Sequence, residues 1–228
     1  EDEWYELRIA GWLHDCGKVI TPVHIMDKAT KLERIWDRIG LMRARIEVMQ
    51  RDLIINAVRE GIPFLEAEEQ TREARAQLSE ALSFIERVNQ GGEYLPPEDK
   101  ARLAELAKMT YMEAGELKMF LDDEELKNLS ISRGTLTEEE RLIINGHMVH
   151  TIQMLEALPF PEHMQRVPEY AGGHHEKMDG EGYPRGLFAG DMSLPARMLA
   201  IADVFEALTA TDRPYKKPKK LSEAMRIM

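Results

Sequence analysis

The stretch LERIWDRIGLMRARIEVMQRDL, residues 32–53, decides the fold class of this 228-residue chain. Its apolar residues recur in alternating steps of three and four, which is the spacing of a coiled-coil seam. They are Leu32, Ile35, Ile39, Met42, Ile46, Met49 and Leu53. A second run with this spacing lies between the breaks at 61–63 and 91–92 and comprises Thr71, Ala74, Leu78, Ala81, Ile85 and Val88. The two runs predict an antiparallel helical hairpin.

The remainder of the chain also favours helices, because Leu, Ala, Met, Glu and Arg dominate and alternating strand patterns are short. Further helices are expected over residues 3–16, 95–109, 138–158, 162–175 and 194–210, and from about Leu221 onward. The sequence therefore predicts an all-α protein.

Composition limits the possible partners and the compartment. With a net charge of -11 and a pI of about 5.2, the chain is not expected to bind a nucleic-acid polymer. Its single cysteine, Cys16, and the lack of a signal peptide or long apolar run predict a cytoplasmic protein without a membrane span. Because the first residue is Glu1, the chain is expected to be a piece of a longer protein.

Histidines and aspartates occur in four separate segments. His14 and Asp15 are adjacent near the end of the first predicted helix, and His174 and His175 are adjacent before a glycine-rich loop. Each pair could hold metal ions, although a capped helix end or a solvated terminus would explain either pair alone. Imidazole and carboxylate together suit Fe, Mn, Zn, Co or Ni better than Ca or Mg.

Two other segments extend this set. Asp203 lies in the apolar stretch MLAIADVFEAL, where a carboxylate needs a partner, either a metal ion or a cation such as Arg197. His147 and His150 share one face of the predicted 138–158 helix, so either could be a ligand or an exposed histidine. An aspartate with several histidines suits a site of two ions, as used in phosphoester hydrolysis.

Several motifs taken together resemble the HD-GYP family of HD-superfamily phosphohydrolases. They are HDCGK at 14–18, GTLTEEE at 134–140, HHEKMDGEGYP at 174–184 and IADVFEALTATDRPYK at 201–216. The resemblance covers residues 5–28 and 134–228 and implies a helical, metal-dependent phosphodiesterase. Its substrate would be the bacterial second messenger cyclic di-GMP, cleaved to pGpG or GMP. Alternatives are hydrolysis of cyclic GMP-AMP or of another nucleotide, and a non-catalytic scaffold for diguanylate cyclase domains.

The resemblance also implies a role for each matching residue. The expected metal ligands are His14, Asp15, His147, His174, His175 and Asp203, with His14, Asp15 and Lys18 as the catalytic group. Tyr183, Arg213 and Lys216 would bind the substrate, although Tyr183 could simply be a packed loop residue. Two divalent transition-metal ions are expected, Fe or Mn before Zn, Ni or Co, with a third as an alternative.

The chain departs from the family pattern in two places. Residues 31–133 separate motifs that are nearly contiguous in the family, so they are interpreted as an inserted helical hairpin between core segments 1–30 and 134–228. The insertion would mediate a homodimer, control access of the substrate or couple the core to an upstream sensor domain, or be a passive addition. The family also carries a Glu and a His on a helix upstream of the HD pair. This chain begins 13 residues before His14 and stops before the family's usual last helices, so the core is expected to be truncated at both ends.

Overall fold

The computed structural model describes residues 2–92, 94–210 and 218–228. They are mostly helical, as predicted, and they divide into two compact units. Unit 1 comprises residues 1–26 and 138–228, and unit 2 comprises residues 27–137. Among the described residues, no helix combines the length and the apolar character needed to cross a bilayer.

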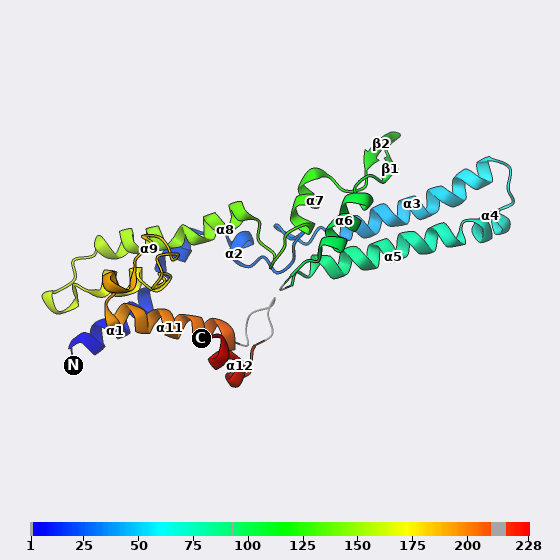
Figure 1. Cartoon of the computed structure of the whole chain (residues 1–228). Coiled ribbons are helices and arrows are strands. Elements are labelled where there is room, and N and C mark those ends of the chain that lie inside the picture. The colour runs from blue at the N-terminus through cyan, green and yellow to red at the C-terminus, as the bar shows by residue number, and fades with distance from the viewer. Residues whose placement is uncertain (1, 93, 211–217) are drawn as a thin grey trace. The chain divides into compact units, whose positions relative to one another are not determined.

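Unit 1 is formed by helices from both ends of the chain (Figure 1). Its N-terminal part contains α1 (Asp2–Leu13), the 3₁₀ helix η1 (Cys16–Ile20) and α2 (Val23–Met26). Its C-terminal part contains α8 (Glu138–Asn145), α9 (His147–Glu156), η2 (Glu162–Met164), α10 (Val167–Gly172), η3 (Ala189–Asp191), α11 (Leu194–Thr209) and α12 (Leu221–Ile227). Contacts of η1 with α9, and of α1 with α10 and α11, join the two parts.

The core of unit 1 holds these distant segments together. Ala10 of α1 is completely buried against Tyr170 of α10 and Leu199 of α11. A buried carboxylate adds a polar connection, because Glu6 accepts the main-chain N–H of Arg166 at 2.9 Å. Burial of these apolar side chains removes them from water, and this stabilises the packing of α1 against α10 and α11.

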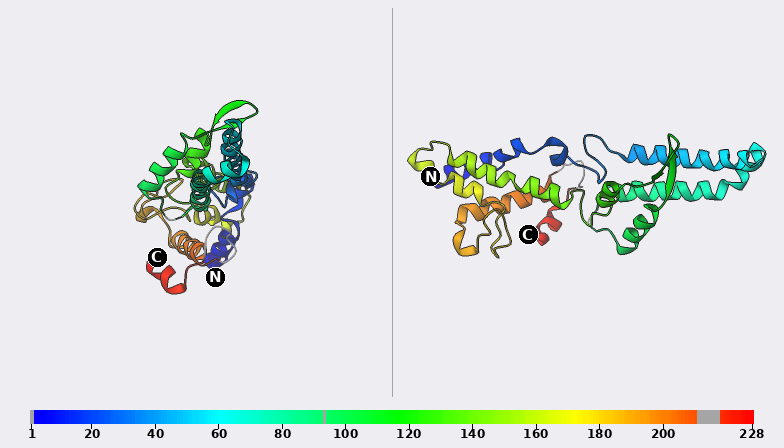
Figure 2. Two further views of the ribbon diagram at one scale, coloured as in Figure 1. Left: turned by 90° about the vertical axis from the view of Figure 1, so that its right-hand side faces the viewer. Right: turned by 90° about the horizontal axis from the view of Figure 1, so that it is seen from above.

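Unit 2 contains the pair of long helices that the spacing predicts. It comprises α3 (Ile39–Arg59), α4 (Phe64–Gln70), α5 (Arg72–Asn89), α6 (Pro97–Leu106), β1 (Thr110–Glu113), β2 (Glu116–Met119) and α7 (Asp123–Leu129). The helices α3 and α5 lie side by side in Figures 1 and 2, and β1 pairs with β2 antiparallel. That this unit is an insertion into a family core stays a prediction.

The first heptad begins later than predicted. Leu32 and Ile35 precede α3, and the Ile35 side chain is 89 % exposed. Asp37 Oδ1 accepts the N–H of Ile39 at 3.0 Å in a turn just before α3 begins. Asn89 at the end of α5 then binds the main chain at Leu32, with its Oδ1 2.7 Å from that N–H. The seam therefore starts at Ile39.

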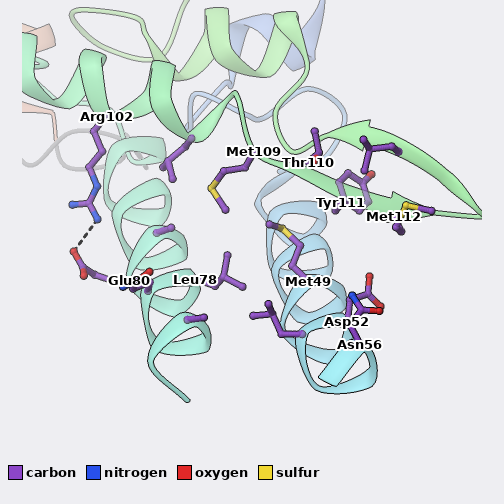
Figure 3. Close-up of a pocket in the computed structure, with 16 residues that line it drawn as sticks. Met49, Asp52, Asn56, Leu78, Glu80, Arg102, Met109, Thr110, Tyr111 and Met112 are labelled. Atoms are coloured by element: carbon purple, nitrogen blue, oxygen red, sulfur yellow. Dashed lines mark hydrogen bonds and ion pairs between the residues drawn. The ribbon is translucent and has the colours of Figure 1, made fainter. Parts of the chain in front are cut away.

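Unit 2 also has an open, mostly apolar pocket of about 640 Å³ between α3, α5, α6 and the strand pair (Figure 3). Met49, Leu78 and Met109 line its interior, and the ion pair of Arg102 with Glu80, at 2.8 Å, lies at one edge. Of the described residues that line it, none is a predicted metal ligand, and Tyr183 is not among them either. The metal-ligand candidates belong to unit 1 instead.

Candidate metal centre

His14 and Asp15 lie just beyond the first helix, although the prediction placed them within it. The helix α1 ends at Leu13, and the two residues form a turn before η1. Gly17 allows this turn to lie directly against α9, because a Cβ at Gly17 would be 2.1 Å from the carbonyl oxygen of His147. The N–H of Gly17 also donates to Thr151 Oγ1 at 2.9 Å. The HD pair is thus held against the helix that carries His147.

His147 is the first residue of α9, because the helix predicted over 138–158 is interrupted at Gly146. A glycine weakens a helix interior, which is consistent with a break at this position. The side chain of His147 is buried and faces Asp15, with 3.3 Å between His147 Nε2 and Asp15 Oδ1. His150, on the same helix, belongs to neither group of possible metal ligands among the described residues.

His174 and His175 follow α10 rather than continuing it, so the helix predicted over 162–175 is wrong at both ends. The structure has the short η2 first, and α10 spans only Val167–Gly172. Pro168 near the start of α10 fits its first turn. A Cβ at Gly173 would lie 2.9 Å from the Cβ of Ala196, so glycine lets the end of α10 pack against α11. The directions of the His174 and His175 side chains are therefore set by the turn that follows α10 and not by a helix.

Asp203 lies on α11, as predicted, and faces the HD pair. Its Oδ1 is 3.6 Å from His14 Nε2. Arg197, the alternative partner, is engaged elsewhere, because its Nε donates to the carbonyl of Met192 at 3.1 Å and its guanidinium also contacts the carbonyl of Ala189. The buried face of α11 thus directs Asp203 toward imidazole nitrogen.

The six predicted ligands come together as two groups that share one carboxylate. Asp15, His147, His174 and His175 form the first group, in which one ligand atom from each residue lies within 4.8 Å of the others. His14, Asp15 and Asp203 form the second group by the same measure. Asp15 Oδ1 faces His147 and His174, at 3.3 and 3.9 Å, and Oδ2 lies 3.2 Å from His14 Nε2. The two carboxylate oxygens thus serve different groups.

Three of the histidines are oriented by the main chain three residues earlier. His14 Nδ1 lies 2.8 Å from the carbonyl of Gly11, His147 Nδ1 lies 2.5 Å from that of Ile144, and His174 Nδ1 lies 2.6 Å from that of Ala171. A carbonyl can only accept, so Nδ1 carries the proton in each ring. Nε2 is therefore the nitrogen of each ring that is left to bind a metal ion, which is the arrangement of metal-binding histidines.

Buried polar atoms without partners mark the centre of the cluster. Asp15 Oδ1, His147 Nε2 and His174 Nε2 are buried and have no hydrogen-bond partner within the described parts of the chain. Leaving such atoms unsatisfied is costly, whereas a cation between them would satisfy all three. The residues therefore fit a divalent transition-metal ion, because imidazole nitrogen and carboxylate oxygen are its preferred donors here.

Electrostatics favour the same interpretation. Burial alone would raise the pKa of Asp15, but contacts with His14, His147 and Lys18 lower it well below its usual range. Hydrogen bonds to Asp15 and then Asp203 raise the pKa of His14 to about 10. The cluster thus attracts positive charge, and a bound cation would replace the proton on His14 Nε2.

His174 and His175 are held neutral. Burial lowers the pKa of His174, and burial together with the neighbouring His174 lowers that of His175 to about 4. Neutral imidazole is the form that binds metal. Both rings therefore present lone pairs at neutral pH.

The remaining predicted residues are only partly described. Lys18 Nζ donates to Asp15 Oδ2 at 2.5 Å, and the Tyr183 ring stacks on the His175 ring at a centroid distance of 4.8 Å. Arg213 and Lys216 lie outside the described residues. Sequence reasoning assigned no role to Glu176, although its position directly after the histidine pair was a signal.

Comparisons with known proteins identify the family of this chain. A family model described as HD domain matches residues 96–228. The chain therefore belongs to the HD domain family, and its HHEKMDGEGYP motif places it in the HD-GYP group.

Particular relatives are phosphodiesterases by name. The 3'3'-cGAMP-specific phosphodiesterase 1 of Vibrio cholerae is 47% identical over 98 residues, 42% of this chain and 21% of that protein. The cyclic di-GMP phosphodiesterase of Thermotoga maritima is 41% identical over 93 residues, 41% of this chain and 25% of that protein. The cyclic di-GMP phosphodiesterase response regulator RpfG of Xanthomonas campestris is 30% identical over 173 residues, 70% of this chain and 43% of that protein. The chain thus spans between a fifth and half of these relatives.

Proposed function

We propose that this chain carries a metal-dependent phosphodiesterase site that hydrolyses cyclic di-GMP to pGpG or GMP. The observation that carries the proposal is the division of six ligands into two groups around the shared Asp15. His147, His174 and His175 would hold one ion with Asp15, and His14 and Asp203 would hold the other. Such ions, when bound, supply an activated water and neutralise charge on the phosphate.

The chain's own residues would prepare the phosphate for attack. Lys18 is half-exposed beside Asp15, so its ammonium group can bind a phosphate oxygen without leaving the site. Burial, followed by the charges of Asp203 and Asp15, raises the pKa of Tyr183 to about 12, so its hydroxyl stays a hydrogen-bond donor. Arg213 and Lys216 are proposed to hold the phosphates, on the motif resemblance alone.

The substrate alternative is cyclic GMP-AMP, which is supported by the names of the Vibrio cholerae relatives. The two substrates share the phosphodiester ring and differ in one base, so the metal groups alone do not distinguish them. Direct comparison of the two cyclic dinucleotides is therefore part of the first experiment.

The alternative from another class is a non-catalytic scaffold that binds diguanylate cyclase domains. Buried, unpartnered ligand atoms at Asp15, His147 and His174 argue for a centre that binds ions. A scaffold could retain ions for structure alone, so turnover rather than metal content decides between the two.

Several finer features belong to the same proposal. Fe or Mn would be the native metal, with Zn, Ni or Co as alternatives and a third ion dependent on an upstream helix. Unit 2 would be an insertion that mediates a homodimer or couples the site to an upstream sensor domain. The protein would act in the cytoplasm, where cyclic dinucleotides are signals.

The test compares two histidines of one helix. His147 belongs to a ligand group and His150 does not, so His147→Gln and His150→Gln are a matched pair on α9. The full chain would be purified without chelator, and bound metal and the hydrolysis of both cyclic dinucleotides measured. We expect two ions and linear product in the unaltered chain and in His150→Gln, and loss of one ion and of the product in His147→Gln.

The outcomes separate the candidates. Linear product from only one dinucleotide identifies the substrate. Bound metal without turnover of either refutes the phosphodiesterase and supports the scaffold. A chain that hydrolyses cyclic di-GMP equally well after His147→Gln would refute the assignment of the ligands.

A further inference from the structure

His175 differs from the other histidines of the cluster in what orients its ring. The Nδ1 atoms of His14, His147 and His174 each contact a carbonyl three residues earlier. Within residues 2–92, 94–210 and 218–228, His175 has no such hydrogen bond. Its ring instead stacks on Tyr183, with an angle of 16° between the two planes and 4.8 Å between the centroids. The tyrosine ring is therefore the flat surface that limits rotation of His175.

A second contact fixes where Tyr183 lies. The N–H of Tyr183 donates to the carbonyl oxygen of His175 at 3.2 Å. The main chain of the loop thus closes back onto the residue whose side chain its tyrosine covers. His175 and Tyr183 are thus joined by two contacts, the stacking of their rings and a main-chain hydrogen bond.

Glu176 holds the far side of the loop. Its side chain is 5 % exposed, and both carboxylate oxygens accept main-chain N–H groups. Oε1 lies 2.7 Å from the N–H of Arg185, and Oε2 lies 2.8 Å from that of Leu187. Glu176, the residue next to His175, is thus hydrogen-bonded to the main chain two and four residues after Tyr183. A buried carboxylate is stabilised by such charge-assisted hydrogen bonds.

Close packing leaves the loop little freedom between these points. A Cβ at Gly182 would lie 2.2 Å from the nitrogen of Lys177 and 2.4 Å from Cα of Glu176. These are main-chain atoms, which cannot move aside as a flexible side chain can. Glycine at 182 is therefore required for the segment before Tyr183 to rest on the segment after His175.

We propose that Tyr183 and Glu176 are positioning residues for a metal ligand: Tyr183 orients the His175 ring by stacking, and Glu176 holds Tyr183 in place through the loop. This inference rests on the proposed metal centre and deepens it. It gives the loop a role in metal affinity that is separate from contact with substrate. The partners that orient a metal-binding histidine typically change metal affinity by about 10- to 100-fold when removed.

The first test separates the ring of Tyr183 from its hydroxyl. Tyr183→Phe keeps the stacking surface, and Tyr183→Leu removes the ring but keeps an apolar side chain. Titration of the metal-free full chain with Co²⁺ would give the affinities by calorimetry, and the visible spectrum would report the ligand geometry of the ion. We expect Tyr183→Phe to bind Co²⁺ with the affinities and spectrum of the unaltered chain. Tyr183→Leu should weaken the binding of one of the two Co²⁺ ions, which is one step of the titration, by about 10- to 100-fold.

The second test addresses Glu176 with a matched control in the same loop. Glutamine has one acceptor oxygen, so Glu176→Gln keeps one main-chain hydrogen bond and sets its NH₂ group against the other N–H. Glu181→Gln makes the same chemical change at an exposed side chain. We expect Glu176→Gln to weaken the Co²⁺ step that Tyr183→Leu weakens and Glu181→Gln to leave both steps unchanged.

Particular results would overturn the inference. If Tyr183→Leu folds, as judged by circular dichroism, and binds Co²⁺ with unaltered affinity and spectrum, Tyr183 does not orient His175. If Glu176→Gln lowers only the melting temperature, its role is structural. Failure of the unaltered chain to bind Co²⁺ would instead refute the proposed metal centre, so the two failures are distinguishable.

Discussion

Replacement of Gly17 by alanine tests how closely the HD turn must approach α9. The added Cβ would lie 2.1 Å from the carbonyl oxygen of His147 and 2.5 Å from the nitrogen of Thr151. Real Cβ atoms essentially never come within 3.0 Å of such atoms, so η1 must move away by about 0.9 Å. Both obstacles are main-chain atoms of a helix, so the shift falls on the HD turn.

The magnitude follows from the distances at the metal groups. Asp15 Oδ1 lies 3.3 Å from His147 Nε2. Asp15 belongs to the turn that Gly17→Ala pushes away, and His147 belongs to α9, so the shift separates the two ligands. Metal-ligand distances tolerate only about 0.2 Å, so a shift of this size removes Asp15 from the first group. Overpacking of this kind also destabilises a core by about 1–3 kcal/mol.

Gly11→Ala is the matched control, because a Cβ there meets only Leu199 Cδ1 at 3.8 Å, an ordinary contact. Alanine within α1 should raise the free energy of unfolding by about 0.5–1 kcal/mol. Urea denaturation and metal titration of both variants provide the measurements. The reasoning is refuted if Gly17→Ala retains both the stability and the metal affinity of the unaltered chain.

Three further predictions concern unit 2. Leu103→Ala should lower the free energy of unfolding by about 2–5 kcal/mol in urea denaturation, because Leu103 is fully buried in the core; a smaller loss would mean that the core closes over the space. Asp122→Ala should cost about 0.5–2 kcal/mol by the same measurement, since Asp122 Oδ1 accepts the N–H of Glu125 at 2.7 Å; an unchanged midpoint would argue against the capping box of α7. Burial, and then the charge of Lys100, lowers the pKa of Lys31 to about 8, so native protein loses this proton before unfolded protein does, and stability gains from Lys31 as pH rises above 8. The free energy of unfolding of the unaltered chain, relative to that of Lys31→Met, should therefore rise by up to about 1.5 kcal/mol between pH 8 and 9.5. A relative free energy that does not change with pH would contradict the lowered pKa.

The helical class was predictable because its signal is local. Met42 and Ile46 in one run, and Leu78 and Ile85 in the other, are buried as the heptad spacing requires. The strand pair β1–β2 was not predicted. Its turn uses Ala114 at φ 52° before Gly115, and alanine at a positive φ is not a recognisable turn signal.

The sequence by itself determined which residue types could bind a metal and which motifs they belong to. Tertiary structure decided how they meet: Asp15 is shared by two groups only because Gly17 lets its turn rest on α9, 134 residues further along the chain. It also placed Tyr183 on His175 and gave Glu176 its two main-chain partners. Sequence patterns report periodicity within one element, whereas ligand distances depend on packing between elements, which no local pattern encodes.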